Sequence, residues 1–348
     1  MAKAKKLPSG SWRVQIPSGE KDMNGKYKYR SITAPTQKEA ELMALEYELK
    51  SKEISQSSAN MTLYEAMVKY IDIKSNVLSP TTVRLYTQIR NSYLKSIMNT
   101  KLNRLNIGLI QSAINDETRS HSPKTVRNIY GLLTAVLKLY NRPLFYQLDI
   151  MLPQKQKRDM RILTPEQLVT LLNAVEGKTI EIPILLAAWL GLRQSEICGI
   201  QWDSIDFKNS ILTIKQAKVM GKDNKYVLKT TKTVSSQRKI QIPVYIMDKI
   251  KQLPRTDDFV INIKAKSIYD GLKYALRKNN LPDTRFHDLR HFNASVMIAL
   301  NVPDKYAMER GGWATDYVYK NVYQHTFSDE RKAVDTSVNN YFLELLKK

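Results

Sequence analysis

Alternation of apolar and polar residues near the start of the chain predicts a small β-sheet. The segment GSWRVQI alternates like a strand, and KYKYRSIT predicts a second strand after the turn-rich stretch PSGEKDMNG at 17–25. Thr36 and Glu39 have the spacing of a capping box, which predicts a helix running to about Lys52. The serine-rich segment SKEISQSSAN that follows is typical of a linker. Residues 1–58 are therefore expected to form a separate unit of strands and a helix.

Between residues 59 and 152 the apolar positions recur with the period of a helix. Capping signals divide this region, because Thr62 begins a second capping box and Ser79 and Ser122 each precede a proline. In the segment after Ser122 one face is apolar, and it comprises Val126, Ile129, Leu133, Val136, Leu137 and Tyr140. This region is therefore expected to be entirely helical.

Two prolines and a basic run in residues 141–160 interrupt the helical pattern and predict a boundary near residues 155–160. Thr164 then opens another helix with a proline at its first position. The remainder alternates helical segments with a β-rich middle at 210–243. The expected fold is multidomain α+β. It comprises a small β-sheet-plus-helix domain (1–58), an all-helical domain (59–158) and a mainly helical domain with a small antiparallel sheet (159–348).

Positive charge is distributed along the whole chain and narrows the choice of partner. Lys and Arg number 55 against 33 acidic residues, which gives a net charge of +22. Residues 1–58, 59–155 and 156–348 carry +4, +8 and +10 of it. A broad positive field attracts a polyanion, and nucleic acid is the leading one, although ribosomal and membrane-surface proteins are equally basic.

Three other features of the composition limit the class of protein. No apolar run reaches the roughly 18 residues that a membrane span needs. The basic first residues lack the apolar stretch of a signal peptide. A single cysteine, Cys198, excludes an internal disulfide framework and is typical of a reducing cytoplasm.

Two motifs suggest a cofactor but lack part of its site. The GKT sequence at Gly177–Thr179 resembles the end of a phosphate-binding loop, but Leu172 stands where that loop needs glycine. His287 and His291 have the i, i+4 spacing of a zinc-protease helix, but Arg290 would place a fixed cation beside the metal. We therefore expect neither a bound nucleotide nor a metal ion.

Four segments carry residues suited to phosphodiester chemistry, which needs cations on the phosphate oxygens, a nucleophile and an acid for the leaving alkoxide. In chain order they offer Arg193 with Glu196, Lys229 and Lys232, His287 with Arg290, and Trp313 followed by Tyr317, Tyr319 and Tyr323. Taken singly, each has an ordinary interpretation: a surface ion pair, solvated hairpin lysines, a helix-surface pair, and an aromatic helix core.

Taken together and in this order, the segments resemble the tyrosine recombinase (phage integrase) family. The shared order is Arg, a hairpin Lys, His-x-x-Arg, Gly-Trp and Tyr-x-His, and three of the four histidines lie within it. The resemblance covers the whole chain. Residues 1–58 look like the arm-site-binding domain of integrases from prophages and integrative conjugative elements, 59–158 like the core-DNA-binding domain, and 159–348 like the catalytic domain.

The resemblance implies a catalytic role for each matching residue. Arg193 and Arg290 would clamp the scissile phosphate, and Lys232 would protonate the 5′-oxygen leaving group. His287 would accept the tyrosine proton or hold the phosphate. Trp313 stands where most members have histidine, and its indole N–H can donate a hydrogen bond but cannot carry protons.

The resemblance also implies the supporting residues and the nucleophile. Glu196 and His291 would support the residues that touch the phosphate. Tyr319 and Tyr323 share one helical face, so geometry alone leaves both open. The spacing that the family uses after the Gly-Trp motif, and the Tyr-x-His context made by His325, select Tyr323, which would form a 3′-phosphotyrosine.

By this resemblance the protein is a cytoplasmic site-specific DNA recombinase that integrates or excises a mobile element. Its partners would be double-stranded DNA at core and arm attachment sites, further copies in a homotetramer, and an excision factor or host DNA-bending protein. The phosphotyrosine conserves the energy of the broken bond, so no cofactor is expected. Two alternatives remain open: a type IB topoisomerase-like enzyme and a catalytically silent DNA-binding regulator.

Overall fold

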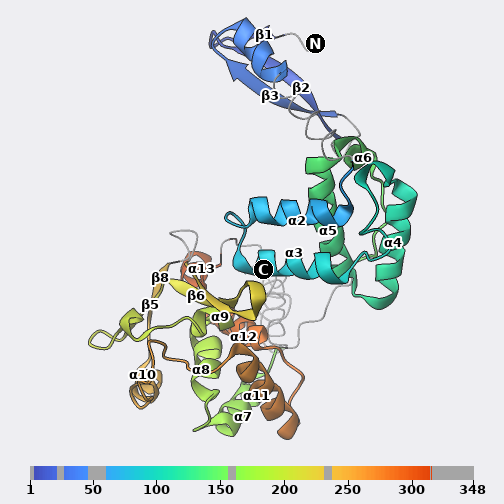
Figure 1. Cartoon of the computed structure of the whole chain (residues 1–348). Helices are drawn as coiled ribbons and strands as arrows, with labels where there is room; N and C mark the ends of the chain where they lie inside the picture. Colours follow the sequence, from blue (N-terminus) through green and yellow to red (C-terminus); the bar gives the residue numbers. More distant parts are fainter. Residues whose placement is uncertain are drawn as a thin grey trace, which may run out of the picture. The chain divides into compact units, whose positions relative to one another are not determined.

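The computed structural model describes residues 4–21, 27–45, 60–155, 162–230, 237–313 and 315 (Figure 1). The chain divides into two compact units, residues 1–157 and 158–348. The expected division of the first unit at residue 58 stays a prediction.

The N-terminal residues form the expected antiparallel sheet, with β1 (Lys5–Lys6), β2 (Trp12–Lys21) and β3 (Tyr27–Ala34) in that order. A helix over residues 37–45 follows, and its capping box is present, since the Glu39 amide donates to Thr36 Oγ1 at 3.3 Å. The sheet and this helix share a small apolar core made of Val14, Ile16, Ala34, Ala40 and Ala44.

The turn predicted from Pro17 onward is wrong at its start, because β2 continues to Lys21. The register between β2 and β3 shifts between Pro17 and Lys21, and this irregularity accommodates residues whose composition is typical of a turn. The predicted helix end near Lys52 and most of the linker, residues 51–59, lie outside the described residues.

Residues 60–155 are helical, as expected, and their described part contains no strand. The helices are α2 (Leu63–Lys74), α3 (Pro80–Ser92), α4 (Ile107–Ser120), α5 (Pro123–Tyr140) and α6 (Arg142–Gln147), with a short 3₁₀ turn, η1 (Leu102–Arg104). Thr62, Ser79 and Ser122 each accept a backbone N–H of the first helical turn, so all three predicted caps are confirmed.

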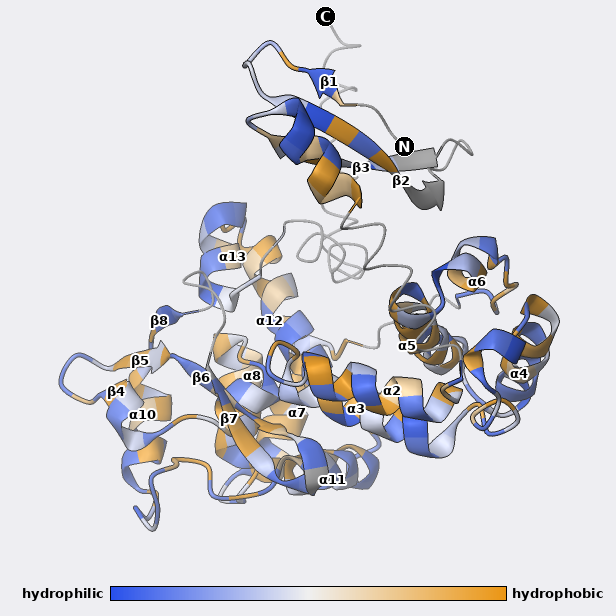
Figure 2. Ribbon diagram, turned by 45° about the horizontal axis from the view of Figure 1, so that its top comes forward, coloured by the Kyte–Doolittle hydropathy of each residue, from blue (hydrophilic) through white to orange (hydrophobic). Residues whose placement is uncertain are grey.

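Helix α5 provides the centre of the helical core. Every residue of its predicted apolar face is buried, and Leu132 joins them. Figure 2 shows much of α5 in the orange of hydrophobic residues. Buried side chains of α2, α3 and α4, among them Leu63, Ile89 and Ile110, pack into the same cluster.

The second unit begins with α7 (Pro165–Val175), α8 (Glu181–Leu190) and the short α9 (Gln194–Ile197). A 3₁₀ turn, η2 (Trp202–Ser204), leads to a three-stranded antiparallel sheet in the order β4 (Ile205–Asp206), β5 (Ile211–Ile214) and β8 (Arg238–Gln241). Between β5 and β8 lies a hairpin of β6 (Gln216–Met220) and β7 (Tyr226–Thr230), joined by η3 (Lys222–Asn224). The unit ends, in its described part, with α10 (Val244–Lys251), α11 (Ala265–Lys278), α12 (Phe286–Ala299) and α13 (Asp304–Gly311).

Helix α8 is the centre of the second unit. All its residues except Trp189 are buried, and it packs against α12. Such a helix, apolar on all sides, is stable only inside a core. The mainly helical fold with a small antiparallel sheet is therefore as predicted, and α8 and α12 bring the predicted Arg193 and His287–Arg290 segments together.

Cys198, the only cysteine of the chain, follows α9 and is 3% exposed. Burial raises the pKa of its thiol to about 11. Among the described residues, no helix combines the length and the apolar content that crossing a bilayer demands.

Candidate active site

Arg193 lies at the junction of α8 and α9. Helix α8 ends at Gly191, whose φ of +67° allows the sharp change of direction. Arg193 then becomes the N-cap of α9, and its backbone N–H donates to Glu196 Oε2 at 3.0 Å. Its guanidinium donates from Nη1 to Glu196 Oε1 at 2.7 Å.

This Arg193–Glu196 pair is not the surface ion pair that either residue alone suggests. The side chain of Glu196 is only 6% exposed, whereas that of Arg193 is 39% exposed. Arg193 also donates from Nη2 to the carbonyl oxygen of Gly312 at 2.8 Å, across 119 residues of sequence. The carboxylate therefore holds an arginine whose outer edge faces solvent.

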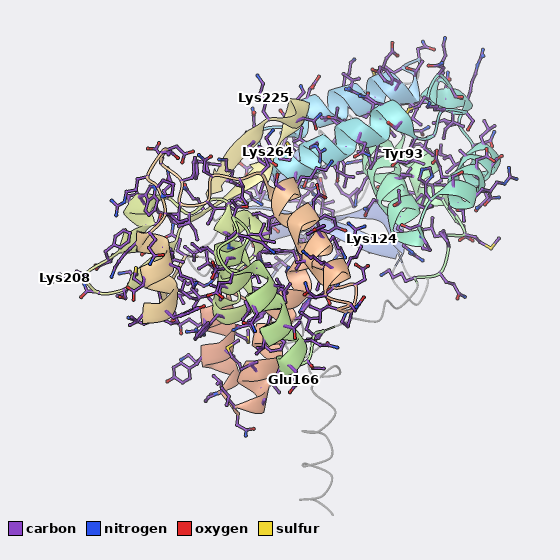
Figure 3. All side chains as sticks on the ribbon, turned by 90° about the horizontal axis from the view of Figure 1, so that it is seen from below. Tyr93, Lys124, Glu166, Lys208, Lys225 and Lys264 are labelled. Carbon is purple, nitrogen blue, oxygen red and sulfur yellow. The ribbon has the colours of Figure 1, made fainter. Side chains whose placement is uncertain are left out.

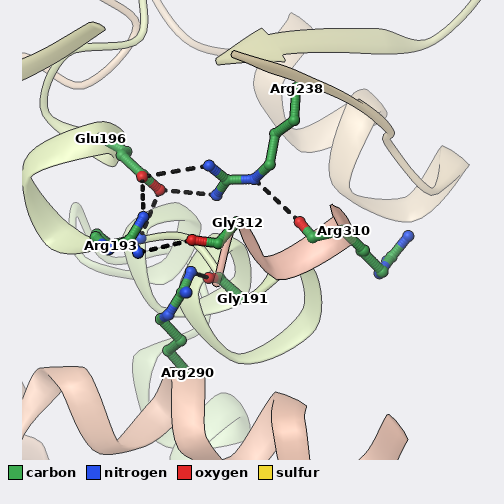
Figure 4. Close-up of polar contacts among 7 residues, drawn as sticks. All are labelled: Gly191, Arg193, Glu196, Arg238, Arg290, Arg310 and Gly312. Carbon is green, nitrogen blue, oxygen red and sulfur yellow. Dashed lines mark hydrogen bonds and ion pairs between the residues drawn. The ribbon is translucent and has the colours of Figure 1, made fainter. Parts of the chain in front are cut away.

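Arg290 approaches the same point from α12. It is 1% exposed, and its Nη1 donates to the carbonyl oxygen of Gly191, the residue that ends α8 (Figure 4). The Arg290 Nε and Nη2 atoms are buried and have no hydrogen-bond partner among the described residues. Burial, together with the charge of Arg193, lowers the pKa of Arg290 to about 9, which still leaves it protonated at neutral pH.

His287 and His291 lie one helical turn apart on α12. Their rings meet edge to face with centroids 4.9 Å apart. The side chain of His287 reaches solvent, but neighbouring protein atoms partly desolvate its ring. This desolvation is the largest cause that lowers the pKa of His287 below 6.5, and the charges of Arg290 and Arg193 lower it further. Burial and its neighbour His287 lower the pKa of His291 to about 4. Both rings are therefore neutral at pH 7, and His287 is able to accept a proton.

Trp313 follows α13 and covers Arg290. The Arg290 guanidinium carbon lies 4.3 Å from the centre of the indole ring, a cation–π contact. The indole is buried against Ala294, Met297 and Ala307. A Cβ at Gly311 would lie 1.8 Å from the ring, so the residue at this position has to be glycine for the ring to pack there.

Sequence reasoning missed one residue of the site, Arg238 at the start of β8. Its side chain is 3% exposed and donates from Nη2 to Glu196 Oε2 at 2.8 Å. Its Nε donates to the carbonyl oxygen of Arg310 at 3.0 Å. A signal was present, because Arg238 alternates with Ile240 and Ile242, all of which are buried.

Arg193, Arg238 and Arg290, with the single carboxylate Glu196, form what we call the arginine cluster (Figure 4). Hydrogen bonds to Arg238, its charge and that of Arg193 outweigh the effect of burial and lower the pKa of Glu196 to about 2. Three guanidinium groups against one carboxylate leave the cluster positively charged. An excess of buried positive charge with unpaired donors is suited to binding an anion.

The other predicted site residues fall into two groups. Lys229 lies within strand β7, opposite Ala217, rather than in a turn. Lys232, the three tyrosines Tyr317, Tyr319 and Tyr323, and His325 lie outside the described residues.

Among the described residues, no group of three His, Cys, Asp or Glu side chains is arranged to hold a metal ion. Asp288, which lies between the two histidines in sequence, instead accepts hydrogen bonds from Arg285 at 2.9 and 2.6 Å.

Comparison with known proteins agrees with this geometry. Residues 161–330 match the model of the phage integrase family. A XerC-like tyrosine recombinase of Caldanaerobacter subterraneus is 23% identical, over 95% of this chain and 96% of the relative. The integrase of Staphylococcus phage L54a is 24% identical, over 82% of this chain and 95% of the relative.

Solved structures share the fold. The Tn1549 transposon integrase, in complex with transposon right end DNA, has a TM-score of 0.64 at 19% identity and covers 80% of this chain and 100% of that chain. A lambda integrase dimer bound to a core site has a TM-score of 0.59 at 15% identity, over 92% and 94% of the two chains. The family match shows that residues 161–330 are a phage integrase domain, and the relatives that align along most of the chain support a tyrosine recombinase, an enzyme that cuts and rejoins DNA at specific sites.

Proposed function

We propose that the arginine cluster holds the scissile phosphate of a DNA strand while Tyr323 attacks it. The observation that supports this most is the state of Arg290, whose Nε and Nη2 are buried and have no hydrogen-bond partner among the described residues. A buried donor without a partner is costly, and more so when it is charged. A phosphate oxygen would satisfy such donors, and the exposed edge of Arg193 would bind a second oxygen.

The proposed reaction uses only side chains of this chain and the DNA. The phenol oxygen of Tyr323 attacks phosphorus and forms a 3′-phosphotyrosine, while the bond to the 5′-oxygen breaks. His287, neutral at pH 7, accepts the phenol proton, and Lys232 gives a proton to the departing 5′-oxygen. The reverse sequence, with a 5′-hydroxyl of another strand, rejoins the DNA.

The remaining site residues would stabilise this arrangement. Trp313 would donate its indole N–H to a phosphate oxygen. Glu196 would hold Arg193 in place, and His291 would keep the ring of His287 in orientation through their edge-to-face contact. A free phenol has a pKa of about 10, so ionising it at pH 7 costs roughly 4 kcal/mol, which the two arginines and His287 would have to offset.

Double-stranded DNA is the proposed partner of all three expected domains. Residues 159–348 would act on the core site, 59–158 would bind beside it, and 1–58 would bind arm sites. Positive charge is present in each of them. Exposed lysines such as Lys124 in the first unit and Lys225 and Lys264 in the second are available for phosphate contacts (Figure 3).

Recombination between two duplexes requires four cleavages, so we propose a homotetramer on DNA. An excision factor or a host DNA-bending protein would select the direction of the reaction. Because the substrate would be chromosomal and mobile-element DNA, the expected location is the cytoplasm of the host cell.

Trapping the covalent intermediate tests the function. The full chain, incubated with a nicked suicide substrate that contains its attachment site, should form a protein–DNA adduct. Tyr323→Phe should abolish the adduct and keep DNA binding, while Tyr317→Phe and Tyr319→Phe should still form it. An adduct that survives in Tyr323→Phe identifies a different nucleophile, and no adduct with any variant or with the wild type indicates a silent DNA-binding protein.

A modified substrate tests the leaving-group acid. A 5′-bridging sulfur leaves readily without a proton, so it should restore cleavage by Lys232→Ala but not by Arg193→Ala. Equal restoration of both variants, or of neither, contradicts the role of Lys232. Strand exchange between two paired sites, rather than relaxation of supercoils alone, separates a recombinase from a type IB topoisomerase.

A further inference from the structure

We propose that Arg238 is a positioning residue of the recombination reaction, which fixes Arg193 through Glu196 and fixes the end of α13 from which the tyrosine-bearing segment continues. The inference rests on the proposed function, because it assigns Arg238 to the same reaction. It concerns a residue outside the set of motifs that the sequence singled out.

Both carboxylate oxygens of Glu196 are bonded to Arg193 and to Arg238. Its Oε1 accepts from Arg193 Nη1 at 2.7 Å and from Arg238 Nη1 at 3.3 Å. Its Oε2 accepts from the Arg193 backbone at 3.0 Å and from Arg238 Nη2 at 2.8 Å. Each oxygen thus receives one bond from each arginine, and a carboxylate held at both oxygens from two sides cannot rotate. Arg238 therefore fixes the orientation of the Glu196 carboxylate toward Arg193.

Arg238 also contacts the end of α13. Besides its bond to the Arg310 carbonyl, the Arg238 guanidinium lies against the backbone of Gly312, where a Cβ would stand 2.8 Å from Nη1. Gly312 has a φ of +66° and gives its own carbonyl oxygen to Arg193. The residue before Trp313 is thus held between two arginines that share one carboxylate (Figure 4).

The position of Arg238 in the chain gives it a further connection to the site. It is the first residue of β8, where it pairs with Ile214 of β5, and Lys232 lies six positions before it. Fixing Arg238 therefore fixes the point at which the segment that carries the leaving-group acid enters the sheet. The Arg238 guanidinium thus connects the Arg193–Glu196 pair with two segments of the chain, the one that continues toward Tyr323 and the one that carries Lys232.

Stability alone does not explain a cation buried to this extent, because an apolar residue of similar volume often gives the same free energy of unfolding. Arg255 of the same unit, by contrast, is exposed and stacks its guanidinium on Trp202 and Phe207, 4.7 and 5.0 Å from the ring centres. Arg255→Met is thus a matched control, with the same change of side chain in the same unit but away from the arginine cluster.

The test measures single-turnover cleavage of the suicide substrate by the full chain at saturating DNA. Arg238→Met should lower the cleavage rate by roughly 10²-fold, the scale of a small misplacement of reacting groups, with DNA affinity unchanged. Arg238→Lys, which keeps the charge but lacks the fork, should recover part of the rate. Arg255→Met should cleave like the wild type.

The pH dependence separates positioning from general damage to the fold. Glu196 is faced by Arg193 of its own turn, Arg238 of β8 and Arg290 of α12, and Arg238 contributes most to lowering its pKa. Without Arg238 the burial remains, so the pKa of Glu196 rises, and its hold on Arg193 is lost as pH falls through the raised value. In Arg238→Met the titration of Glu196 should therefore add to the acid limb set by His287, so that the cleavage rate falls at higher pH and more steeply. This added fall should be absent from the double variant Arg238→Met, Glu196→Gln, which has no carboxylate to titrate at this position.

The double variant also tests whether Arg238 affects the cleavage rate through Glu196. If Arg238 acts through Glu196, the rate losses of Arg238→Met and Glu196→Gln should overlap rather than multiply. Wild-type cleavage by Arg238→Met, multiplied losses, or an unmoved acid limb would each overturn the inference. If Arg238→Met does not fold, Arg238→Lys carries the test, and a wild-type rate and acid limb in that variant overturn it. The proposed function stands or falls separately, on whether the wild type forms an adduct that Tyr323→Phe abolishes.

Discussion

The helical region of the first unit and the arginine cluster of the second are held together in opposite ways. In the helical region the side-chain bonds that begin the helices are local: Thr62 and Glu65, three residues apart, bond to each other's backbone N–H. In the cluster Arg193 and Glu196 are also close in sequence, but the bonds that complete it join distant parts of the chain, since Arg238 and Glu196 are 42 residues apart and Arg193 and Gly312 are 119 apart. Local bonds set where helices begin, whereas the distant ones set where charges meet.

The two regions also differ in what they bury. The buried core of the helical region is apolar, and α5 contributes more of it than any other helix. In the described part of the chain, the buried charged residues all lie in the second unit: Glu181, Glu196, Arg238, Asp288 and Arg290. This contrast indicates that the first core is organised for stability, while the second accepts the cost of buried charge in order to hold an anion.

The sharpest test of this contrast is Arg290→Met. Loss of a preorganised donor to the phosphate should slow adduct formation by roughly 10³-fold. Removing a buried cation with unpaired donors should leave the free energy of unfolding unchanged or raise it by about 1–4 kcal/mol, measured by denaturant titration. A loss of several kcal/mol of stability, with normal cleavage by the folded fraction, would show that Arg290 stabilises the fold rather than holding the phosphate.

The opposite result is expected for Leu133→Ala in α5. Leu133 is fully buried, so its truncation should lower the free energy of unfolding by about 2–5 kcal/mol, measured by urea titration. Asn128→Ala, on the exposed side of the same helix, is the control and should stay within about 0.5 kcal/mol of the wild type. A small effect at Leu133 would mean that the helical core is not the source of stability in this region.

A smaller effect should appear in the pH dependence of cleavage. The pKa of His287 is lowered below 6.5, so the imidazole stays neutral and able to accept a proton at pH 7. As pH falls through this lowered pKa the imidazole takes up a proton, and the cleavage rate should fall by about tenfold per pH unit. Single-turnover rates measured between pH 5 and 8 check this, and the cleavage rate of His287→Gln should lack this fall, the acid limb of the profile. An unchanged limb in His287→Gln would assign the proton acceptor to another group.

The smallest effect concerns a cap of the helical region. Ser122→Ala removes the side-chain acceptor for the Thr125 N–H and should lower the free energy of unfolding by about 1 kcal/mol. Ser122→Asp keeps an acceptor and should restore most of that loss. Calorimetry of the two variants measures the difference, and equal stability of both would show that this cap contributes nothing.

The same contrast explains how much of the molecule could be predicted from sequence. The caps at Ser79 and Ser122 and the buried face of α5 follow from neighbouring residues, so the pattern predicted them correctly. Pro17 was expected to start a turn, but pairing with β3 extends the strand past it. Arg238 was missed because its partner is far away in the chain, although its alternation with buried isoleucines placed it on the inner face of β8. Lys232 and Tyr323 stay predictions.

The buried thiol of Cys198 has a practical consequence for watching this enzyme at work. Since it is the chain's sole cysteine, is 3% exposed and has a pKa of about 11, almost none of it is in the thiolate form that maleimide dyes attack. A cysteine introduced at an exposed position such as Lys208 or Lys225 would then be the one reactive thiol. The wild-type chain, which maleimide dyes do not label, is thus the control for fluorescence energy transfer measurements with the labelled variant on single DNA molecules.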